Sequence, residues 1–228
     1  LDEADAMLQM GFIEDVEALL DATPSTRQTA LFSATLPPAI RQLAARYMRD
    51  PLTVAIDETR TVPQTTQRYY LIQESSKIAA LTLLLEAEEI KSALIFARTR
   101  VGAAALAETL VSRGYPAEAL HGDLSQTARE TVLRHFRNGR VTLLVSTDVG
   151  ARGLDIAEVS HVVNFDMPFG VTDYVHRIGR TGRAGRPGMA LTLVTPSERQ
   201  RLRAIEVFTG QPLVRATLPS PAAVEAQR

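Results

Sequence analysis

The sequence contains no cysteine, and only two of its 25 lysine and arginine residues, Lys77 and Lys91, are lysines. Without cysteine the chain forms no disulfide and offers no thiolate ligand to zinc, which fits a reducing, cytoplasmic location. No apolar run approaches the ~20 residues that span a bilayer and no signal peptide is visible, so we expect no membrane partner. The formal net charge is −1, so any binding to nucleic acid requires a local basic patch.

A Walker A motif is also absent. This phosphate-binding loop places a lysine directly after a glycine, in the pattern G-x-x-x-x-G-K-[ST]. Lys77 follows Ser76 and Lys91 follows Ile90, so neither lysine fits the pattern. The sequence begins at Leu1 without an initiator methionine, and we expect it to be a fragment of a longer protein.

Hydrophobic residues make up 45% of the 228 residues, which is enough for a sizeable core and for more than one domain. Apolar pattern and composition divide the chain into four parts. The predicted parts are the end of an α/β domain at 1–57, a polar linker at 58–66, a second domain at 67–210 and a Pro- and Ala-rich tail at 211–228.

The first part has a helical period over 5–21 that is interrupted at Gly11. A further helix is predicted to open at Pro37 and to stop before Asp50-Pro51. Short apolar runs predict strands at 29–33 and 52–56.

The second domain alternates short apolar runs with segments of helical period. Several runs, such as Ala93–Phe96 and Leu143–Val145, are apolar throughout. This favours a parallel sheet covered on both faces over an exposed antiparallel one. The predicted strands are 68–72, 93–97, 117–120, 142–146, 161–165 and 190–194, and the predicted helices are 78–87, 101–112, 127–136, 172–180 and 198–208.

Acidic residues open the chain, in the run Asp2-Glu3-Ala4-Asp5. Carboxylates that follow a buried strand can hold Mg²⁺ through water and polarise an attacking water. Such a run is also typical of a helix N-terminus, where carboxylates complement the helix dipole. Ser33-Ala34-Thr35, at the end of the next predicted strand, favours the first interpretation, although alone it would be a turn or a cap before Pro37.

Three polar segments follow predicted strands in the second domain. Ile95–Arg100 and His121–Arg129 lead from a strand end into a helix, where basic and hydroxyl groups can bind phosphates. Helix caps beside solvated arginines explain the same residues. Ser146–Asp155 is more specific, because it combines glycines for close backbone approach, a hydroxyl and amides for phosphate, and a carboxylate for a ribose hydroxyl.

A basic segment, His176–Arg183, comes later in the chain. Arg180 and Arg183 stand three residues apart, so a single helical turn would place both on one face, with His176 one turn earlier. Two guanidiniums aimed the same way suit a polyphosphate whose charge grows during transfer. An isolated R-x-x-R pair is equally compatible with a solvated basic turn.

In this order, the acidic run, Ser33-Ala34-Thr35 and His176–Arg183 resemble the DEAD-box RNA helicase family, in its bacterial form. The resemblance extends from Leu1 to about residue 210 and corresponds to the later half of the family's core. It implies an α/β fold with a complete second RecA-like lobe, a parallel sheet flanked by helices, and the C-terminal remnant of a first RecA-like lobe. The family usually has alanine where this chain has Gly150, a change that removes no functional group.

The resemblance implies that ATP and Mg²⁺ are bound. Asp2 and Glu3 would hold the metal through water, and Glu3 would act as general base. Arg180 and Arg183 would be arginine fingers on the γ-phosphate, where one such finger can raise the rate by ~10³–10⁵. The other nucleotide contacts implied are Gly153 and Asp155, the latter at the ribose, and the residues implied to couple the lobes are Asp5, Ser33, Thr35 and His176.

RNA is the implied partner, held mainly through its backbone and 2′-hydroxyls with little sequence specificity. The residues assigned to this contact by the resemblance are Arg98, Thr99, Gly122, Gln126, Arg129, Thr147 and Asp148. The implied activity is an RNA-stimulated ATPase that locally unwinds duplexes, and we expect this chain alone, without Walker A, to be inactive. The alternatives are an RNA-binding lobe without turnover, a DNA-directed helicase relative, and a RecA-like lobe kept as a scaffold.

Overall fold

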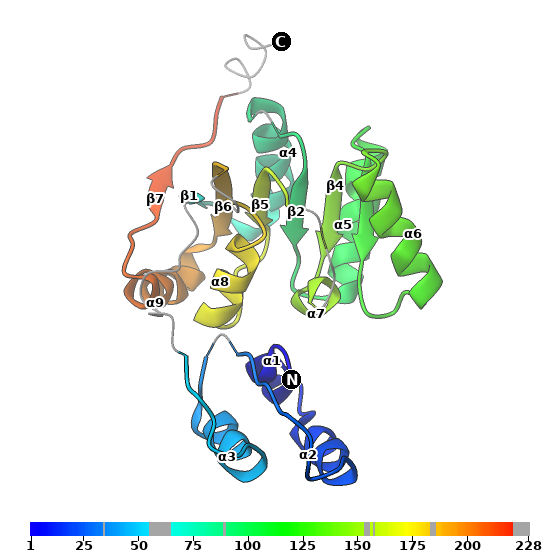
Figure 1. Ribbon diagram of the computed structural model, residues 1–228. Coiled ribbons are helices and arrows are strands. Elements are labelled where there is room, and N and C mark those ends of the chain that lie inside the picture. The colour runs from blue at the N-terminus through cyan, green and yellow to red at the C-terminus, as the bar shows by residue number, and fades with distance from the viewer. Residues whose placement is uncertain are drawn as a thin grey trace. The chain divides into compact units, whose positions relative to one another are not determined.

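The computed structural model describes residues 1–33, 35–54, 65–88, 90–152, 156, 158–182 and 186–220. The chain divides into two compact units, Leu1–Ile56 (unit 1) and Asp57–Arg228 (unit 2). Figure 1 draws unit 1 in shades of blue and unit 2 from cyan to red. Within the described ranges, no helix combines the length and the apolar character needed to cross a membrane.

Unit 1 consists mainly of helices α1 (Ala4–Gln9), α2 (Ile13–Ala22) and α3 (Pro38–Tyr47). Gly11 separates α1 from α2 with a φ of +78°, a conformation that side chains rarely adopt, so the break predicted at this glycine is confirmed. Val16 and Leu20 of α2 pack against Leu43 of α3 and form a small core. The helical period of the sequence is therefore sufficient to predict these elements.

The two strands predicted in unit 1 are not found in the described residues. Residues 29–33 have no regular secondary structure, although Phe32 N–H donates to the Leu1 carbonyl (2.9 Å) and the Leu1 amino group donates to the Ala30 carbonyl (2.8 Å). Leu52 and Val54 are 89% and 78% exposed, so a buried strand is wrong for residues 52–54, while residues 55–56 lie outside the described residues. A strand needs a neighbour with which to pair, and an apolar run alone does not supply one.

Unit 2 contains a seven-stranded sheet in the order β3-β4-β2-β5-β6-β1-β7. Every strand pair in it is parallel, so the predicted parallel sheet is confirmed. The strands are β1 (Thr65–Leu71), β2 (Ala93–Phe96), β3 (Ala117–Leu120), β4 (Leu143–Ser146), β5 (His161–Asn164), β6 (Gly188–Val194) and β7 (Val214–Ala216). The sequence does not predict β7, which pairs with β1 and lies in the part assigned to a tail.

Helices cover both faces of this sheet (Figure 1). They are α4 (Lys77–Ala87), α5 (Arg100–Ser112), α6 (Gln126–Arg137), α7 (Asp148–Ala151), α8 (Val171–Ile178) and α9 (Arg199–Thr209), with short 3-10 helices η2 (Glu74–Ser76) and η3 (Pro196–Glu198). Ile95 and Val145 pack on one face with α4 and α5. Their neighbours Leu94 and Leu144 pack on the other face with α6, because successive strand residues point to opposite sides. The side chains of α8 and α9 share a third core cluster with Ala190 and Val194 of β6.

Candidate functional site

In unit 1, Asp5 is 3% exposed and organises the residues around it. Its Oδ2 accepts hydrogen bonds from the Thr35 amide (3.0 Å) and the Thr35 hydroxyl (2.8 Å). The Ser33 hydroxyl accepts from the Asp5 amide (3.1 Å) and donates to the Thr35 carbonyl (2.6 Å). The structure therefore brings Asp5, Ser33 and Thr35 into direct contact, while Ala34 lies outside the described residues.

Asp2 and Glu3 precede this cluster and are more accessible than Asp5. Glu3 has φ of +51° and ψ of +46°, a left-handed conformation that costs a residue with a side chain about 1–3 kcal/mol. The Asp2 Oδ1 accepts from the Glu3 amide (2.9 Å). Among the described residues no group of three or more His, Asp or Glu is arranged to enclose a metal ion. Two accessible carboxylates fit Mg²⁺, which usually keeps waters and takes only one or two protein carboxylates beside substrate phosphates.

In unit 2, the strand register aligns the last residues of four neighbouring strands. Phe96 lies opposite Ser146 on one side and Asn164 on the other, and Leu120 lies opposite Ser146. The segments that follow β3, β4, β2 and β5 therefore leave the sheet along one edge, named here the carboxyl edge. Open α/β sheets bind ligands outside this edge. The polar segments after β2, β3 and β4 that the sequence singles out all begin there.

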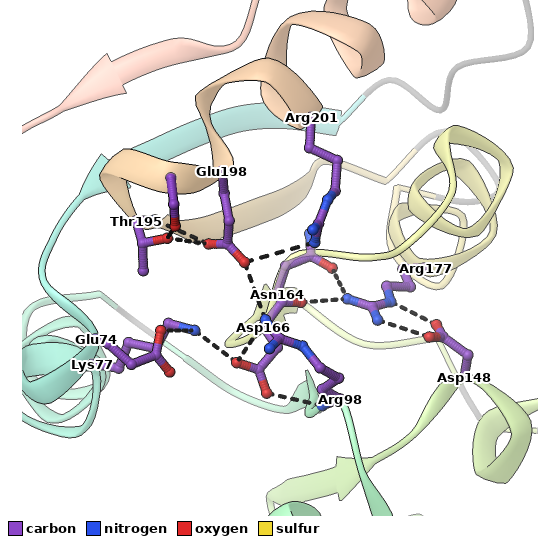
Figure 2. A network of polar contacts seen from close by, with 11 residues as sticks. Glu74, Lys77, Arg98, Asp148, Asn164, Asp166, Arg177, Thr195, Glu198 and Arg201 are labelled. Atoms are coloured by element: carbon purple, nitrogen blue, oxygen red, sulfur yellow. Dashed lines mark hydrogen bonds and ion pairs between the residues drawn. The ribbon is translucent and has the colours of Figure 1, made fainter.

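Arg177 of α8 is 2% exposed, and its guanidinium is paired at the carboxyl edge (Figure 2). Its Nε and Nη2 donate to the two carboxylate oxygens of Asp148, at 2.6 and 2.8 Å. Its Nη1 donates to Asn164 Oδ1 (3.1 Å) and to the Asp166 carbonyl (2.7 Å), and its Cζ lies 4.8 Å from the centre of the Phe96 ring. A buried guanidinium requires such pairing, because an uncompensated buried charge is strongly destabilising. Arg177 thus joins α8 to the segments that follow β4 and β5.

Asp166 is the second centre of this network. Its Oδ1 accepts from the Nζ of Lys77, which is 1% exposed, at 2.7 Å, and its Oδ2 accepts from the Arg98 amide at 2.9 Å. Lys77 also lies 3.0 Å from Glu74 Oε2. Asp166 therefore fixes the backbone at Arg98 against the segment after β5, while the Arg98 side chain remains 41% exposed.

Glu198 connects this edge to α9. Its Oε2 accepts from the amide and the hydroxyl of Thr195 (3.0 and 2.9 Å), which is a capping box around η3. Its Oε1 accepts from Arg98 Nη2 (3.1 Å) and lies 3.7 Å from Arg201 Nη1. Figure 2 shows Arg98 and Arg201 reaching the same carboxylate from different elements.

Hydroxyls at this edge cap helices. Thr99 accepts from the Gly102 amide at the start of α5 (3.0 Å), and Thr147 accepts from the Gly150 amide at the start of α7 (3.1 Å). Ser125 caps α6 in the same way, through the Ala128 amide (3.2 Å). The cap interpretation of Thr99 and Ser125 is therefore confirmed, and Thr147 is a further cap. Each hydroxyl proton remains able to donate to an anionic ligand.

The remaining candidates of the β3–α6 segment face solvent to different degrees. Gly122 and Gln126 are exposed, and Gln126 Nε2 donates to Glu130 Oε1 (2.8 Å). Arg129 is half-buried, and its Nε has no hydrogen-bond partner among the described residues. Arg100 pairs with Asp123 beside them.

Gly150 lies where the backbone of α7 meets the end of β3. A Cβ at this position would lie 2.4 Å from the Leu120 carbonyl oxygen, 2.8 Å from Ser146 Oγ and 3.1 Å from His121 Cα. In this structure glycine permits a close approach of α7 to the β3 end.

Two family models match the chain. A model described as "DEAD/DEAH box helicase" matches residues 1–43, which contain the Asp5 cluster, and one described as "Helicase conserved C-terminal domain" matches residues 76–185. The DEAD-box ATP-dependent RNA helicase CshA of Geobacillus kaustophilus is 51% identical over 221 residues, which are 96% of this chain and 47% of that protein. The CshA of Bacillus subtilis is 48% identical over 96% of this chain and 45% of its own length.

The chain belongs to the DEAD-box helicase family.

Solved structures of DEAD-box proteins agree with this assignment. The structure titled "S. cerevisiae Dbp5 bound to RNA and ADP BeF3" is similar with a TM-score of 0.89 and 36% identity, over 100% of this chain and 61% of that one. A structure of the C-terminal domain of Dbp5 has a TM-score of 0.66 and 36% identity, over 73% of this chain and 98% of that one. The sheet of unit 2, with its flanking helices, is the RecA-like fold of these DEAD-box proteins. The chain spans about half the length of the CshA relatives that it matches.

The basic segment, His176–Arg183, departs from the predicted geometry. The helix ends at Ile178, so Arg180 lies in the following turn and not on a helical face that would continue to Arg183. The Thr181 hydroxyl, which is buried, donates to the Val159 carbonyl (2.6 Å), and Gly182 turns the chain with φ of +70°. These contacts hold the turn against the segment that leads into β5, and they replace another helical turn.

Arg180 is partly exposed, and its carbonyl accepts from the Val159 amide (3.2 Å). His176 is partly exposed on α8. Three nucleotide-binding candidates, Gly153, Asp155 and Arg183, lie outside the described residues, so the structure does not place them.

Sequence reasoning missed Arg177, Asp166 and Glu198, which hold the edge together. A signal existed for Arg177, since it lies three residues after Tyr174 and next to Ile178, both fully buried. The Tyr174 hydroxyl donates to Gln67 Oε1 (2.8 Å), and burial raises the pKa of this phenol. Asp166 and Glu198 gave no signal, because their partners come from separate strands and helices.

Proposed function

We propose that this chain supplies part of an ATP-dependent RNA helicase, in which RNA binding at the carboxyl edge of unit 2 controls phosphoryl transfer. The observation that carries the proposal is Arg177, whose buried guanidinium holds Asp148 with two hydrogen bonds. Asp148 belongs to the proposed RNA contact, and Arg177 belongs to α8, which leads directly to the proposed finger Arg180. A displacement of the segment after β4 by RNA would therefore act on α8 through this pair.

For nucleotide chemistry we assign the acidic residues of unit 1. Mg²⁺, when bound, neutralises charge on the phosphates and lowers the barrier to attack by water. Asp2 and Glu3 would hold its water shell, and Glu3 would accept a proton from the attacking water. The hydrogen bonds of Asp5 to Thr35 would transmit changes at the nucleotide to residues 33–35. Unit 1 is in this proposal the end of the ATP-binding lobe. Of the linker predicted at 58–66, residues 58–64 lie outside the described residues, and Thr65 and Thr66 belong to β1.

Arg180 and Arg183 would donate to the γ-phosphate as its charge increases, and Gly153 and Asp155 would contact the nucleotide. His176 would couple this segment to Ser33 and Thr35. This chain has no glycine–lysine pair with which to bind a triphosphate. On its own it should therefore show no RNA-stimulated ATPase activity. A turnover rate near that of a complete DEAD-box enzyme, measured on this chain alone, would contradict the assignment.

For RNA we assign the residues along the carboxyl edge of unit 2: Arg98, Thr99, Gly122, Gln126, Arg129, Thr147 and Asp148. Their donors are guanidiniums, hydroxyls, an amide group and backbone N–H groups, which suit phosphates and 2′-hydroxyls better than base edges. Affinity for single-stranded RNA should therefore fall as salt rises and should depend little on sequence.

The test is fluorescence anisotropy of a labelled single-stranded RNA titrated with this chain at several salt concentrations. Arg129→Ala should weaken binding and reduce the salt slope by about one ion. Arg113→Ala is the matched control, because Arg113 is an exposed arginine at the opposite end of α5. Equal losses in the two variants, or stronger competition by DNA than by RNA of the same sequence, would contradict RNA binding at this edge.

A second candidate is an RNA-binding lobe that does not itself turn over ATP. It is favoured by one observation, namely that every proposed RNA residue lies in unit 2, which has its own sheet and core. Addition of a separate DEAD-box first lobe that carries Walker A distinguishes the two candidates. RNA-stimulated ATP turnover that is lost in Arg180→Ala would support the first, whereas salt-dependent RNA binding without turnover would support this one.

A further inference from the structure

Phe169 is an aromatic side chain that unit 2 leaves 70% exposed. It lies between β5 and α8, in a loop whose other residues are held in place. Met167 is 1% exposed in the core cluster beneath α8 and α9. The Gly170 amide donates to Asp173 Oδ2 (3.2 Å), which caps α8. The ring is therefore presented to solvent by an anchored backbone, which lowers the entropy lost when a ligand covers it.

One cationic side chain, Arg201, lies against Phe169. The Cζ of Arg201 lies 5.8 Å from the centre of its ring, and the ring remains largely exposed despite this contact. The carboxylates near this loop are already paired: Glu198 accepts from Arg98 and Thr195, Asp166 from Lys77, and Asp173 from Arg152 and the Gly170 amide. The site therefore favours an anionic ligand over a cationic one.

Phe169 also continues the row of proposed RNA contacts. Those contacts follow β3, β4 and β2, whereas Phe169 follows β5, the next strand in the sheet, and Arg201 follows β6. A direct series of contacts joins them, from Arg98 to Glu198 (3.1 Å), from Glu198 to Arg201 (3.7 Å) and from Arg201 to the Phe169 ring (5.8 Å). A strand of RNA that lies along the carboxyl edge and passes Arg98 would therefore meet Phe169.

We propose that Phe169 is a stacking platform for a base of single-stranded RNA, flanked by Arg201, at the β5–β6 end of the carboxyl edge. The proposal rests on the proposed RNA binding and adds a contact to a base, where the other assigned residues contact the backbone. An aromatic face beside arginines is the usual combination for sequence-tolerant binding of single strands, because every base offers a π-face.

The absence of tryptophan from the chain gives a direct test. Phe169→Trp introduces a single indole at the proposed platform, and its fluorescence should be quenched when a single-stranded adenosine oligonucleotide stacks on it. An oligonucleotide of equal length with abasic sugars keeps the phosphates and should bind without quenching. Val207→Trp is the matched control, since Val207 is 84% exposed on α9, and its indole should respond to neither.

Affinity is the second measurement, made by anisotropy on the same oligonucleotides. Phe169→Ala should weaken binding of the adenosine oligonucleotide roughly 5- to 100-fold and leave binding of the abasic one unchanged. Phe169 is exposed, so this variant should fold normally, and circular dichroism would confirm it.

Three outcomes would overturn the proposal. Unchanged affinity of Phe169→Ala for the adenosine oligonucleotide, with Arg129→Ala still weakened, removes the platform but leaves the RNA site. Quenching of Phe169→Trp by ATP alone, equal to that by RNA, assigns the ring to a nucleotide and not to a strand. No RNA binding by the unaltered chain removes both the platform and the proposed function.

Discussion

Unit 1 and unit 2 hold their polar residues in different ways. In unit 2, the carboxyl edge is built on a seven-stranded sheet whose core side chains, such as Leu94 and Val145, are fully buried. In unit 1, the Asp5 cluster depends on α1–α3 and a small core, while Leu19 and Phe32 remain 69% and 64% exposed. Burial of one such side chain stabilises a fold by about 1.5–3 kcal/mol, so unit 1 has much less apolar stabilisation.

This difference shows why the two sites use different chemistry. A buried ion pair loses the solvation of two charges, and a rigid surrounding core is needed to keep the pair in good geometry. Unit 2 provides that core and holds Asp148 and Asp166 with Arg177 and Lys77. In unit 1 a single carboxylate, Asp5, accepts hydrogen bonds from neutral donors, the amide and the hydroxyl of Thr35, while the Ser33 hydroxyl accepts from the Asp5 amide. Three substitutions and one pH measurement test this difference between the ion pairs of unit 2 and the hydrogen bonds of unit 1.

The largest effect is expected in unit 2, for Arg177→Ala. The change leaves Asp148 without its two guanidinium hydrogen bonds and leaves Asn164 Oδ1 without its donor. Unit 2 should lose about 3–5 kcal/mol of unfolding free energy, measured by urea denaturation with circular dichroism. Arg100→Ala removes an exposed ion pair with Asp123 and should cost at most about 1 kcal/mol. If both variants lose the same unfolding free energy, the stability of the carboxyl edge does not depend on the buried Arg177–Asp148 pair.

In unit 1, Asp5→Ala should be the most damaging polar substitution. It removes the acceptor of the Thr35 amide and hydroxyl, which should cost about 1–3 kcal/mol. Hydrogen exchange of the α1–α3 amides would report the loss separately from unit 2. Gln42→Ala, on the exposed face of α3, should leave exchange unchanged. Slower exchange in the Asp5 variant would contradict the role of this carboxylate as an organiser.

Gly150→Ala tests the close approach at the carboxyl edge and should have a smaller effect. The added methyl meets the Leu120 carbonyl, so α7 must shift, at a cost of about 1 kcal/mol in urea denaturation. Gly122→Ala is the control, because its Cβ would meet no atom closer than 4.0 Å. Equal stability of the two variants would show that α7 relaxes freely.

The smallest effect concerns pH. Burial lowers the pKa of His161, whose nearest charged influences are Glu88 and Arg68 and whose Nδ1 contacts Ser160 Oγ (2.9 Å). The unfolded chain then takes up this proton at a higher pH than the folded one, so stability should fall as pH drops below about 6.5. His161→Gln should make the unfolding free energy of unit 2 less dependent on pH between 7 and 5, by roughly the contribution of one group. An unchanged pH dependence would exclude His161 as its source.

The sequence predicted most of the fold of unit 2, since fully apolar runs such as Ala93–Phe96 are typical of strands buried on both faces. It failed at β7, which has only three residues and forms because β1 offers a free edge. It also extended α8 through Arg180, because neither the anchoring of Thr181 at Val159 nor the turn at Gly182 is visible in a helical period. Both failures concern elements whose ends are set by contacts with distant segments.

The sequence by itself determined the family, through the acidic run at Asp2–Asp5 and the basic segment His176–Arg183, because those residues keep their order and spacing whatever surrounds them. It also determined which residues follow strand ends. Only the tertiary structure decided that Arg177 faces inward to Asp148, that Asp166 and Glu198 join separate elements, and that Phe169 remains uncovered beside Arg201. The physical reason is that pairing and burial depend on neighbours in space, and parallel strands bring together residues that are tens of positions apart in the chain.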